Sequence, residues 1–353
     1  MKKLTLFVAA YLLVLTGSAQ NMKAFISHKA YCTDKMQPYI EFTFIIGGNS
    51  VKYALNEHQK FEADVDIRVD VAKGDTVVKT LHYILSSDEF ADTTGQLPDF
   101  ADIQNLPVPN GDFFLNFYLT DLHQDSMQLK YIDRIVLNFP EDKISSSRIS
   151  LYEDLRAPES TDMYIKYGFC LPPSYYNFIP ENQYTLPFAL EIYNTKHVLG
   201  AGVPLVAKCF VENAENKLVA LPNNIITKEL TTDDVVLVID QFNVFKLPSG
   251  NYNTVVELYD EHDSLLLVNK VFFQRSNPSV QLDLTRYNDV VVENSFVASM
   301  TDRKVLEENV HCLYPISTTV ERNFFENRMK DVETEQLQRY FYAFWLARNP
   351  NNP

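Results

Sequence analysis

Two short segments of the chain combine acidic residues with a histidine, which are side chains that bind metal ions. The segments are Asp121-Leu122-His123-Gln124-Asp125 and Asp260-Glu261-His262-Asp263. Calcium takes roughly six to eight oxygen ligands, and imidazole with carboxylate suits transition metals. Both segments fall where we predict tight hairpin turns, in which an aspartate hydrogen-bonds its own backbone. We therefore predict turn-capping aspartates, with no metal site and no cofactor.

The chain lacks the sequence motifs by which many enzymes are recognised. It contains no HExxH, GxSxG, Walker or GxGxxG motif, and none of its 7 histidines is paired at i and i+4. Its 46 acidic residues would supply the carboxylate pair of a glycoside hydrolase, but nothing singles out one pair. We therefore predict no catalytic residues and a protein that is not an enzyme.

Aromatic residues are concentrated in one segment near the middle of the chain. They are Tyr164, Tyr167, Phe169, Tyr175, Tyr176, Phe178 and Tyr184. Exposed rings there would bind sugars or a partner protein. We favour the alternative that the rings fill the junction between two domains, because aromatic side chains mostly serve burial.

A second set of apolar residues lies near the C-terminus, at spacings of three and four residues. The set is Leu337, Tyr340, Phe341, Phe344 and Trp345. This spacing places the five side chains on one face of a helix. A preceding helix through Met329, opened by a capping box at Thr318 and Glu321, covers only part of that face. We therefore predict a partner-docking surface, covered by the second β domain or by sequence beyond Pro353.

The elements that carry these residues are mostly strands. Residues 61–71 alternate apolar and polar side chains almost without fault, which is the pattern of a half-buried antiparallel strand. Lys73-Gly74-Asp75 predicts a turn, and residues 76–85 predict the partner strand. Short strands separated by turns every ten or so residues favour a β-sandwich.

One part of this pattern occurs twice. Gly111 is followed by Phe113 and then Asp121, and Gly250 is followed by Tyr252 and then Asp260 at the same spacing. A Pro-Gly turn that leads into an aromatic-led strand and an Asp-rich turn is typical of the last two strands of an immunoglobulin-like sandwich. The repeat predicts two such sandwiches in tandem.

We therefore predict a mainly β protein, with two tandem immunoglobulin-like β-sandwiches followed by a small α-helical C-terminal region. The expected organisation is a signal peptide at 1–19, a first sandwich at 20–144, a linker and aromatic-rich junction at 145–185, a second sandwich at 186–276 and a helical region at 277–353. We expect the helical region to be truncated.

The N-terminus predicts export. Lys2 and Lys3 precede an apolar run from Leu4 to Leu15, and small residues lead to a cleavage site after Ala19. The run is shorter than the roughly 20 residues of a membrane span, and no later segment is long and apolar enough. We expect an exported protein, periplasmic or associated with the outer membrane, without a transmembrane segment after cleavage.

Charge and cysteine content restrict the partners and leave the redox state open. The formal net charge of −15 opposes binding to nucleic acid or anionic headgroups. Cys32, Cys170, Cys209 and Cys312 allow three disulfide pairings, and an oxidising compartment would permit them. Buried free thiols are at least as good an interpretation, because a chain of this size needs no covalent staples.

Several dispersed segments resemble a known family. They are Pro38–Glu41, Glu191–Asn194, Leu247–Tyr252, Phe272–Pro278, Cys312–Ile316, Leu337–Trp345 and Arg348–Pro350. In these segments the chain is similar to GWxTD-domain-containing exported proteins of Bacteroidota. The naming motif itself is absent, because the single tryptophan, Trp345, follows Phe344 rather than glycine. The resemblance implies an envelope-associated interaction or assembly component, and a chain that stops before the motif.

Two functions follow from these observations. The first is a non-enzymatic envelope protein whose sandwiches bind other envelope proteins and assemble with them. The second is a carbohydrate-active or peptidase-like exported enzyme with β-sandwich accessory domains. The missing motifs and the repeated β-modules favour the first.

Overall fold

The computed structural model describes residues 22–124, 128–160, 162, 164–174 and 176–349. The predicted signal peptide at 1–19 lies outside this range. Of the residues that the structure describes, 44% are in strands and 17% in helices, which confirms a mainly β fold with a small C-terminal helical region. It divides into two compact units. The first comprises the chain up to Lys29 with Tyr39–Leu137, and the second comprises Ala30–Pro38 with Asn138–Pro353.

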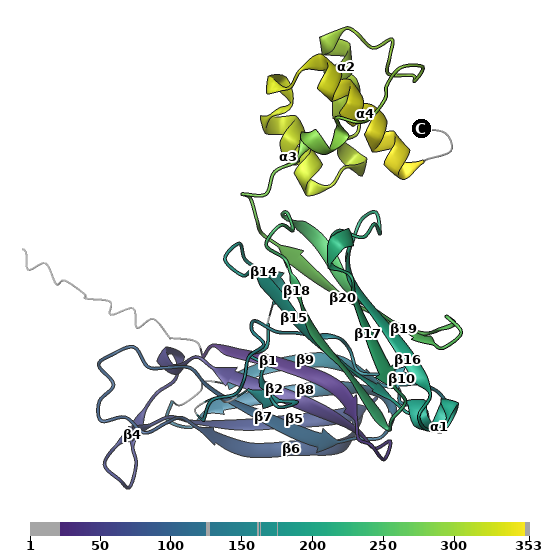
Figure 1. Ribbon diagram of the computed structural model, residues 1–353. Coiled ribbons are helices and arrows are strands. Elements are labelled where there is room, and N and C mark those ends of the chain that lie inside the picture. The colour runs from purple at the N-terminus through teal and green to yellow at the C-terminus, as the bar shows by residue number, and fades with distance from the viewer. Residues whose placement is uncertain (1–21, 125–127, 161, 163, 175, 350–353) are drawn as a thin grey trace, which may run out of the picture. The chain divides into compact units, whose positions relative to one another are not determined.

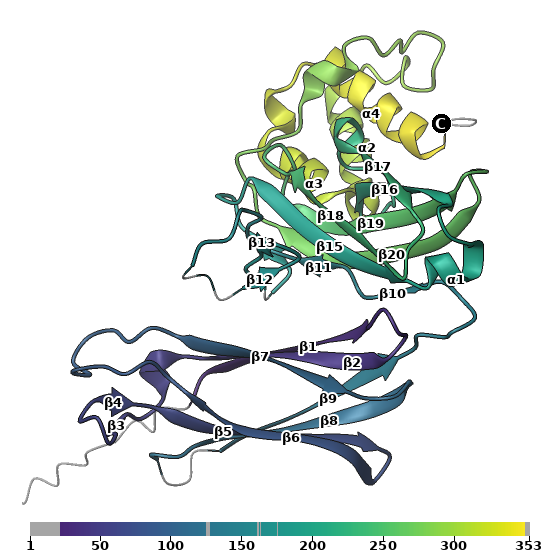
Figure 2. The same ribbon diagram turned by 60° about the horizontal axis from the view of Figure 1, so that its bottom comes forward.

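The first unit is a β-sandwich of two sheets, seen edge-on in Figure 2. One sheet has the order β1-β2-β7 and the other the order β6-β5-β8-β9. The strands are β1 (Ala24–Cys32), β2 (Pro38–Ile46), β5 (Asp64–Lys73), β6 (Thr76–Ser86), β7 (Phe100–Pro107), β8 (Gly111–Asp121) and β9 (Gln128–Leu137). In the chain, β2 and β5 are connected through a short hairpin of β3 (Ala54–Leu55) and β4 (Phe61–Glu62). Sheets of three and four strands in this order form an immunoglobulin-like sandwich.

The alternation in β5 produces the core of this sandwich. Val65, Ile67 and Val69 are fully buried, while Arg68 between them is exposed. Gly74 in the β5–β6 turn has a φ of 58°, a left-handed conformation that glycine adopts without steric cost. The hydrophobic period of two and the turn residue therefore specify this hairpin together.

The second unit begins with another sandwich of the same kind, visible in Figures 1 and 2. In one sheet β15 (Thr185–Tyr193) pairs with β18 (Val235–Asn243) and with the short strands β10 (Ser145–Ser146) and β11 (Ser150–Leu151). The other sheet has the order β14-β20-β19-β16-β17. Its strands are β14 (Phe178–Ile179), β16 (Pro204–Asn213), β17 (Ile226–Thr231), β19 (Gly250–Asp260) and β20 (Leu265–Arg275).

The segment 145–185 differs from the linker that we expected. β10 and β11 pair with β15, and β14 pairs in parallel with β20. Between these strands, β12 (Ile165–Lys166) and β13 (Phe169–Cys170) form a hairpin. Each strand is only two residues long, too short for an alternating pattern to be recognised in the sequence. The serines of this segment, which favoured a linker, instead form hydrogen bonds with β15, including Ser147 N–H to the Glu191 carbonyl at 2.9 Å.

The repeated sequence pattern marks equivalent strands in the two sandwiches. Gly111 opens β8 and Gly250 opens β19, and the rings of Phe113 and Tyr252 are buried. A Cβ built on Gly111 would lie 2.7 Å from Cζ of Phe113. The ring of the residue two positions later thus occupies the space of a side chain at the glycine. This close approach explains why the pattern pairs glycine with an aromatic residue.

The C-terminal region is helical, with short α- and 3₁₀-helices around a core of its own. The elements are η3 (Leu284–Tyr287), α2 (Arg303–His311), η4 (Tyr314–Ile316), α3 (Thr319–Asn327), η5 (Met329–Asp331) and α4 (Thr334–Arg348). The predicted capping box is present, with the Thr318 and Glu321 side chains each bonded to the other residue's backbone. None of the helices in the described part of the chain is long and apolar enough to span a bilayer.

Candidate functional site

The two acidic segments considered for metal binding lie at turns. Oδ1 of Asp121 accepts a hydrogen bond from the His123 N–H at 2.9 Å, and Oδ1 of Asp260 accepts one from the His262 N–H at 2.9 Å. Asp125 lies outside the described residues. Nowhere in the described part of the chain do three His, Cys, Asp or Glu side chains gather closely enough to hold a metal ion.

All four cysteines are free thiols in this structure. Cys32, Cys170 and Cys209 are buried, and Cys312 is exposed. Burial raises the pKa of Cys32 to about 11 and that of Cys209 to about 12. A thiol needs its thiolate form to act as a nucleophile. The two thiols with these raised pKa values are therefore unreactive at neutral pH.

The predicted C-terminal docking surface is part of a core. Leu337 and Tyr340 are fully buried, Phe341 and Phe344 are 5% and 3% exposed, and Trp345 is partly buried against them. The residues that cover them are Leu284, Val297, Leu306, Val310, Leu313, Phe324, Phe325 and Met329. Half of this cover comes from residues 284–310, which precede the capping-box helix that we expected to cover part of the face. Four of these five side chains are therefore buried rather than exposed to a partner, and Trp345 is partly covered.

The central aromatic segment, in contrast, is largely exposed. Tyr176 is 81% exposed, Tyr184 is 56%, Phe178 is 47% and Phe169 is 38%. Tyr175 lies outside the described residues. Only Tyr164 and Tyr167 are intermediate, and the Tyr167 hydroxyl donates a hydrogen bond to the Glu191 carboxylate. The interpretation that these rings fill a junction is therefore wrong for the four exposed ones.

One of these rings, Tyr184, belongs to a larger exposed feature of the second sandwich. Its ring packs edge-on against Phe245 with a centroid separation of 5.4 Å, and Phe245 is itself 55% exposed. Phe245 lines an open groove of about 360 Å³. The groove is otherwise lined by Ala220, Leu221, Pro222, Asn223, Asn224, Asn243 and Lys246. We call this groove, together with Tyr184, the aromatic groove.

Strand pairing brings the two rings together. Thr185 in β15 lies opposite Asn243 in β18, and the Val244 N–H donates to the Tyr184 carbonyl at 2.9 Å. Tyr184 and Phe245 are 61 residues apart in the chain, so no local pattern links them. Phe245 follows an apolar strand and is not distinguished from core aromatics by its neighbours. Its exposure beside Tyr184 could therefore not be predicted from the sequence.

A buried arginine holds the main chain beneath both rings. Arg275 is 3% exposed and forms no ion pair among the described residues. Its guanidinium donates to main-chain carbonyls of both ring-bearing segments, namely those of Pro180, Gln183 (2.9 Å), Val244 (3.3 Å) and Leu247 (3.5 Å). Desolvation lowers the pKa of Arg275 from its usual value. The cation thus replaces water as the partner of these buried carbonyls.

Asn277 supports the same loop from the end of β20. Its Nδ2 donates to the carbonyls of Phe245 at 2.8 Å and Leu247 at 3.0 Å. Its backbone N–H donates to Ser249 Oγ at 2.7 Å. Together with Arg275, these bonds fix the backbone on both sides of Phe245, so the groove is formed before any ligand arrives.

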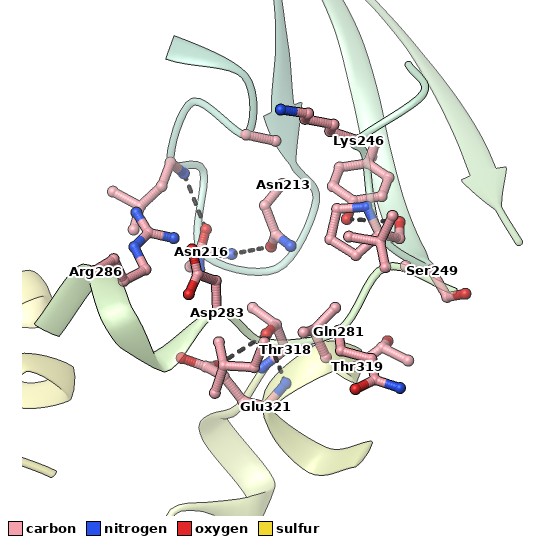
Figure 3. A pocket seen from close by; sticks show the side chains of 18 of the residues that line it. Asn213, Asn216, Lys246, Ser249, Gln281, Asp283, Arg286, Thr318, Thr319 and Glu321 are labelled. Atoms are coloured by element: carbon pink, nitrogen blue, oxygen red, sulfur yellow. Dashed lines mark hydrogen bonds between the residues drawn. The ribbon is translucent and has the colours of Figure 1, made fainter. Parts of the chain in front are cut away.

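A second cavity of about 450 Å³, shown in Figure 3, lies beside the loop after β16 and the start of α3. Most of its polar side chains are engaged in local turns and caps. Asn213 Oδ1 accepts the backbone N–H groups of Glu215 and Asn216. Glu321 Oε2 accepts both the Thr318 N–H at 2.8 Å and Arg348 Nη2 at 3.1 Å. These interactions leave few lining groups for a ligand, and we prefer the aromatic groove as the candidate site.

No protein-family model and no curated protein sequence matches the chain. Among solved structures it is similar to the fibronectin(III)-like modules of CbhA from Clostridium thermocellum, at 12% identity over 69% of this chain and 89% of that one, with a TM-score of 0.19. It is also similar to CBD12 from CALX1.2, at 13% identity over 64% and 76%, with a TM-score of 0.17. The trypsin-activated alpha-2-macroglobulin from Escherichia coli aligns at 12% identity over 73% of this chain and 16% of that one, with a TM-score of 0.20. At these TM-scores the strand order, and not the alignments, defines the fold.

Proposed function

We propose that the protein is an exported, non-enzymatic component of the cell envelope that binds a partner through its immunoglobulin-like modules. The aromatic groove carries the proposal. Tyr184 and Phe245 hold more than half of their surface in solvent, although exposing aromatic rings is unfavourable. The buried Arg275 keeps the main chain beneath them in place. Large exposed rings on a rigid frame are typical of binding surfaces.

The chemistry of the groove supports binding rather than bond-making. Its described lining residues offer an aromatic ring, carboxamides and one ammonium group, and include no carboxylate, imidazole or thiol. Carboxylates, imidazoles and thiols are among the commonest groups in general acid–base and nucleophilic catalysis, so their absence from this lining supports a binding role. A binding role needs only shape, apolar surface and hydrogen-bonding groups.

Export and family membership complete the proposal. The apolar run Leu4–Leu15 with its preceding lysines supports passage across a membrane and removal of residues 1–19. The segments Glu191–Asn194, Leu247–Tyr252 and Phe272–Pro278 support a relationship to GWxTD-domain-containing proteins. Two of these segments contribute to the support of the groove. Leu247, whose carbonyl accepts from Arg275 and Asn277, begins one of them, and Arg275 and Asn277 lie in the other.

The test is capture of partners from an envelope extract by the full mature chain. Phe245→Ala should abolish capture of the specific partner, because it removes an exposed ring from the groove. Phe114→Ala is the matched control, because Phe114 is 47% exposed on the first sandwich and is not part of the groove. Equal capture by both variants and the unmodified chain would show that the groove is not the binding surface.

A further inference from the structure

We propose that the aromatic groove is a carbohydrate-binding site that holds a pyranose ring of a short glycan against Tyr184 and Phe245. The inference rests on the proposed function and names the chemical class of its partner. Three features carry it: the arrangement of the two rings, the carboxamides beside them, and the charge of the groove.

The two rings form an angular platform. Their planes meet at 69°, and each ring is more than half exposed. A pyranose has one face made of C–H groups, and this face packs on an aromatic ring as other apolar surfaces do. Two rings at a steep angle contact a sugar face and the edge of the same or the next sugar, which a single flat ring does not.

Carboxamides lie beside the platform. Asn243 Oδ1 accepts the Phe245 N–H at 3.0 Å, and Asn224 Nδ2 donates to the Asn243 carbonyl at 3.0 Å. These bonds orient both amides and leave Asn243 Nδ2 and Asn224 Oδ1 for a ligand. Asn223 contributes both a donor and an acceptor. A sugar hydroxyl also donates and accepts, so it satisfies either kind of group.

The same amides disfavour an apolar protein anchor. A leucine or phenylalanine inserted into the groove would bury the Asn223, Asn224 and Asn243 side chains without partners. A polar group that a ligand buries without a partner is costly. A ligand that is apolar on one face and rich in hydroxyls at its edge avoids that cost.

The charge and volume of the aromatic groove restrict the kind of sugar that it could bind. Lys246 is the charged residue among those lining the groove, in a chain whose net charge is −15. The groove therefore accepts neutral or carboxylate-bearing sugars and disfavours cationic ligands. Its volume of about 360 Å³ lies near the lower end of the range of about 300–1,000 Å³ for ligand sites, which suits a short oligosaccharide.

The experiment is isothermal titration of the full mature chain with three probes: cellotetraose, the tetramer of N-acetylglucosamine, and tetragalacturonate. We expect at least one probe to bind. Binding of tetragalacturonate alone would identify a carboxylated ligand contacting Lys246, and binding of either neutral probe would identify a neutral glycan. A folded protein that binds none of the three overturns the inference.

Variants locate the site. Phe245→Ala and Asn223→Ala should each weaken binding by about tenfold, equivalent to about 1.4 kcal/mol, while Phe114→Ala leaves it unchanged. Asn223 makes no hydrogen bond among the described contacts, so its variant should fold even if the Phe245 variant does not. Unchanged affinity in the Asn223 variant places the sugar elsewhere. If Phe245→Ala abolishes capture of an envelope protein while no sugar binds, the proposed function stands and the carbohydrate inference fails.

Discussion

The two sandwiches share a framework and differ at two register-matched positions. Gly111 pairs with Leu137 in the first sandwich, and Gly250 pairs with Arg275 in the second. The buried position two residues after the glycine is Phe113 in one and Tyr252 in the other. Leu137 is 1% exposed and contributes apolar packing alone. Arg275 is 3% exposed and donates hydrogen bonds to four backbone carbonyls.

This difference explains why the groove belongs to the second sandwich. An apolar side chain at the end of the last strand donates no hydrogen bonds, so the backbone carbonyls of nearby loops need other donors. A guanidinium has five N–H donors and can fix two separate loops at once. The Tyr252 hydroxyl adds a bond to the Pro248 carbonyl at 3.1 Å, which Phe113 cannot make. The aromatic groove is thus built on a common fold by adding polar groups beneath it.

The largest expected effect comes from removing the buried cation. Arg275→Met should destabilise the second sandwich by about 3 kcal/mol, because it leaves buried carbonyls without donors. Leu137→Met at the matched position should cost less than about 1.5 kcal/mol, because it conserves volume. Fragment-resolved hydrogen exchange measures the two sandwiches separately. Equal effects at the two positions would refute the comparison.

A smaller effect is expected at the aromatic position. Tyr252→Phe removes the buried hydroxyl and leaves the Pro248 carbonyl without that donor, which should cost about 1 kcal/mol. The loop at residues 244–250 should then exchange faster, with little change in the first sandwich. Tyr259→Phe in the same strand is the control, because the Tyr259 hydroxyl bonds the Glu257 side chain, outside this loop. A similar rise in loop exchange in both variants would argue against the role assigned to Tyr252.

The smallest effect concerns side-chain bridges between the first and last strands of each sandwich. In the first, Nε2 of His28 in β1 lies 3.0 Å from Oδ2 of Asp133 in β9. In the second, Asn269 Nδ2 in β20 donates to the Ser147 carbonyl at 2.7 Å, next to β10. Only the first bridge contains a carboxyl group, that of Asp133.

The two bridges should therefore respond differently to acid. Burial opposes ionisation of Asp133, but hydrogen bonds from His28, the Arg134 N–H and Tyr131 outweigh burial and lower the pKa of its carboxyl. A depressed carboxyl pKa contributes stability above the unfolded value of about 4, and this contribution is lost as the pH falls through the folded value. Asp133 is 41% exposed, so solvent screening limits the effect to less than about 1 kcal/mol.

The measurement is hydrogen exchange of β1 and β9 between pH 6 and pH 3, corrected for intrinsic rates. Protection of these strands should fall relative to β10 and β20, and Asp133→Asn should remove the difference. If β10 and β20 lose protection to the same extent, the loss comes from general acid destabilisation and not from the His28–Asp133 bridge.

Local sequence patterns were sufficient to predict much of the fold. The alternation in β5, the Gly74 turn and the Thr318–Glu321 capping box each depend on neighbours within a few residues, and each is present in the structure. The Gly111 and Gly250 repeat identified equivalent strands because a glycine and the ring above it are only two positions apart. Such signals can be recognised because the interacting groups are close in the sequence.

The two main errors concern burial. The spacing of Leu337 to Trp345 correctly indicated an apolar helix face, but not what covers it, because half of the cover comes from residues 284–310, which are distant in the sequence. The aromatic segment was assigned to a junction on composition alone, yet Tyr176 and Tyr184 are exposed. Exposure depends on what other parts of the chain pack nearby, and composition carries no information about that.

The sequence by itself thus determined that the chain is mainly β, that it contains two related sandwiches and that helices follow them. Those properties depend on periodicity and short-range turn chemistry. Only the tertiary structure decided where a ligand could bind. Pairing of β15 with β18 brings Tyr184 against Phe245, and the side chain of Arg275 reaches carbonyls up to 95 residues away in the chain. Contacts between distant residues arise only when the strands assemble, because each partner alone resembles an ordinary strand or loop residue.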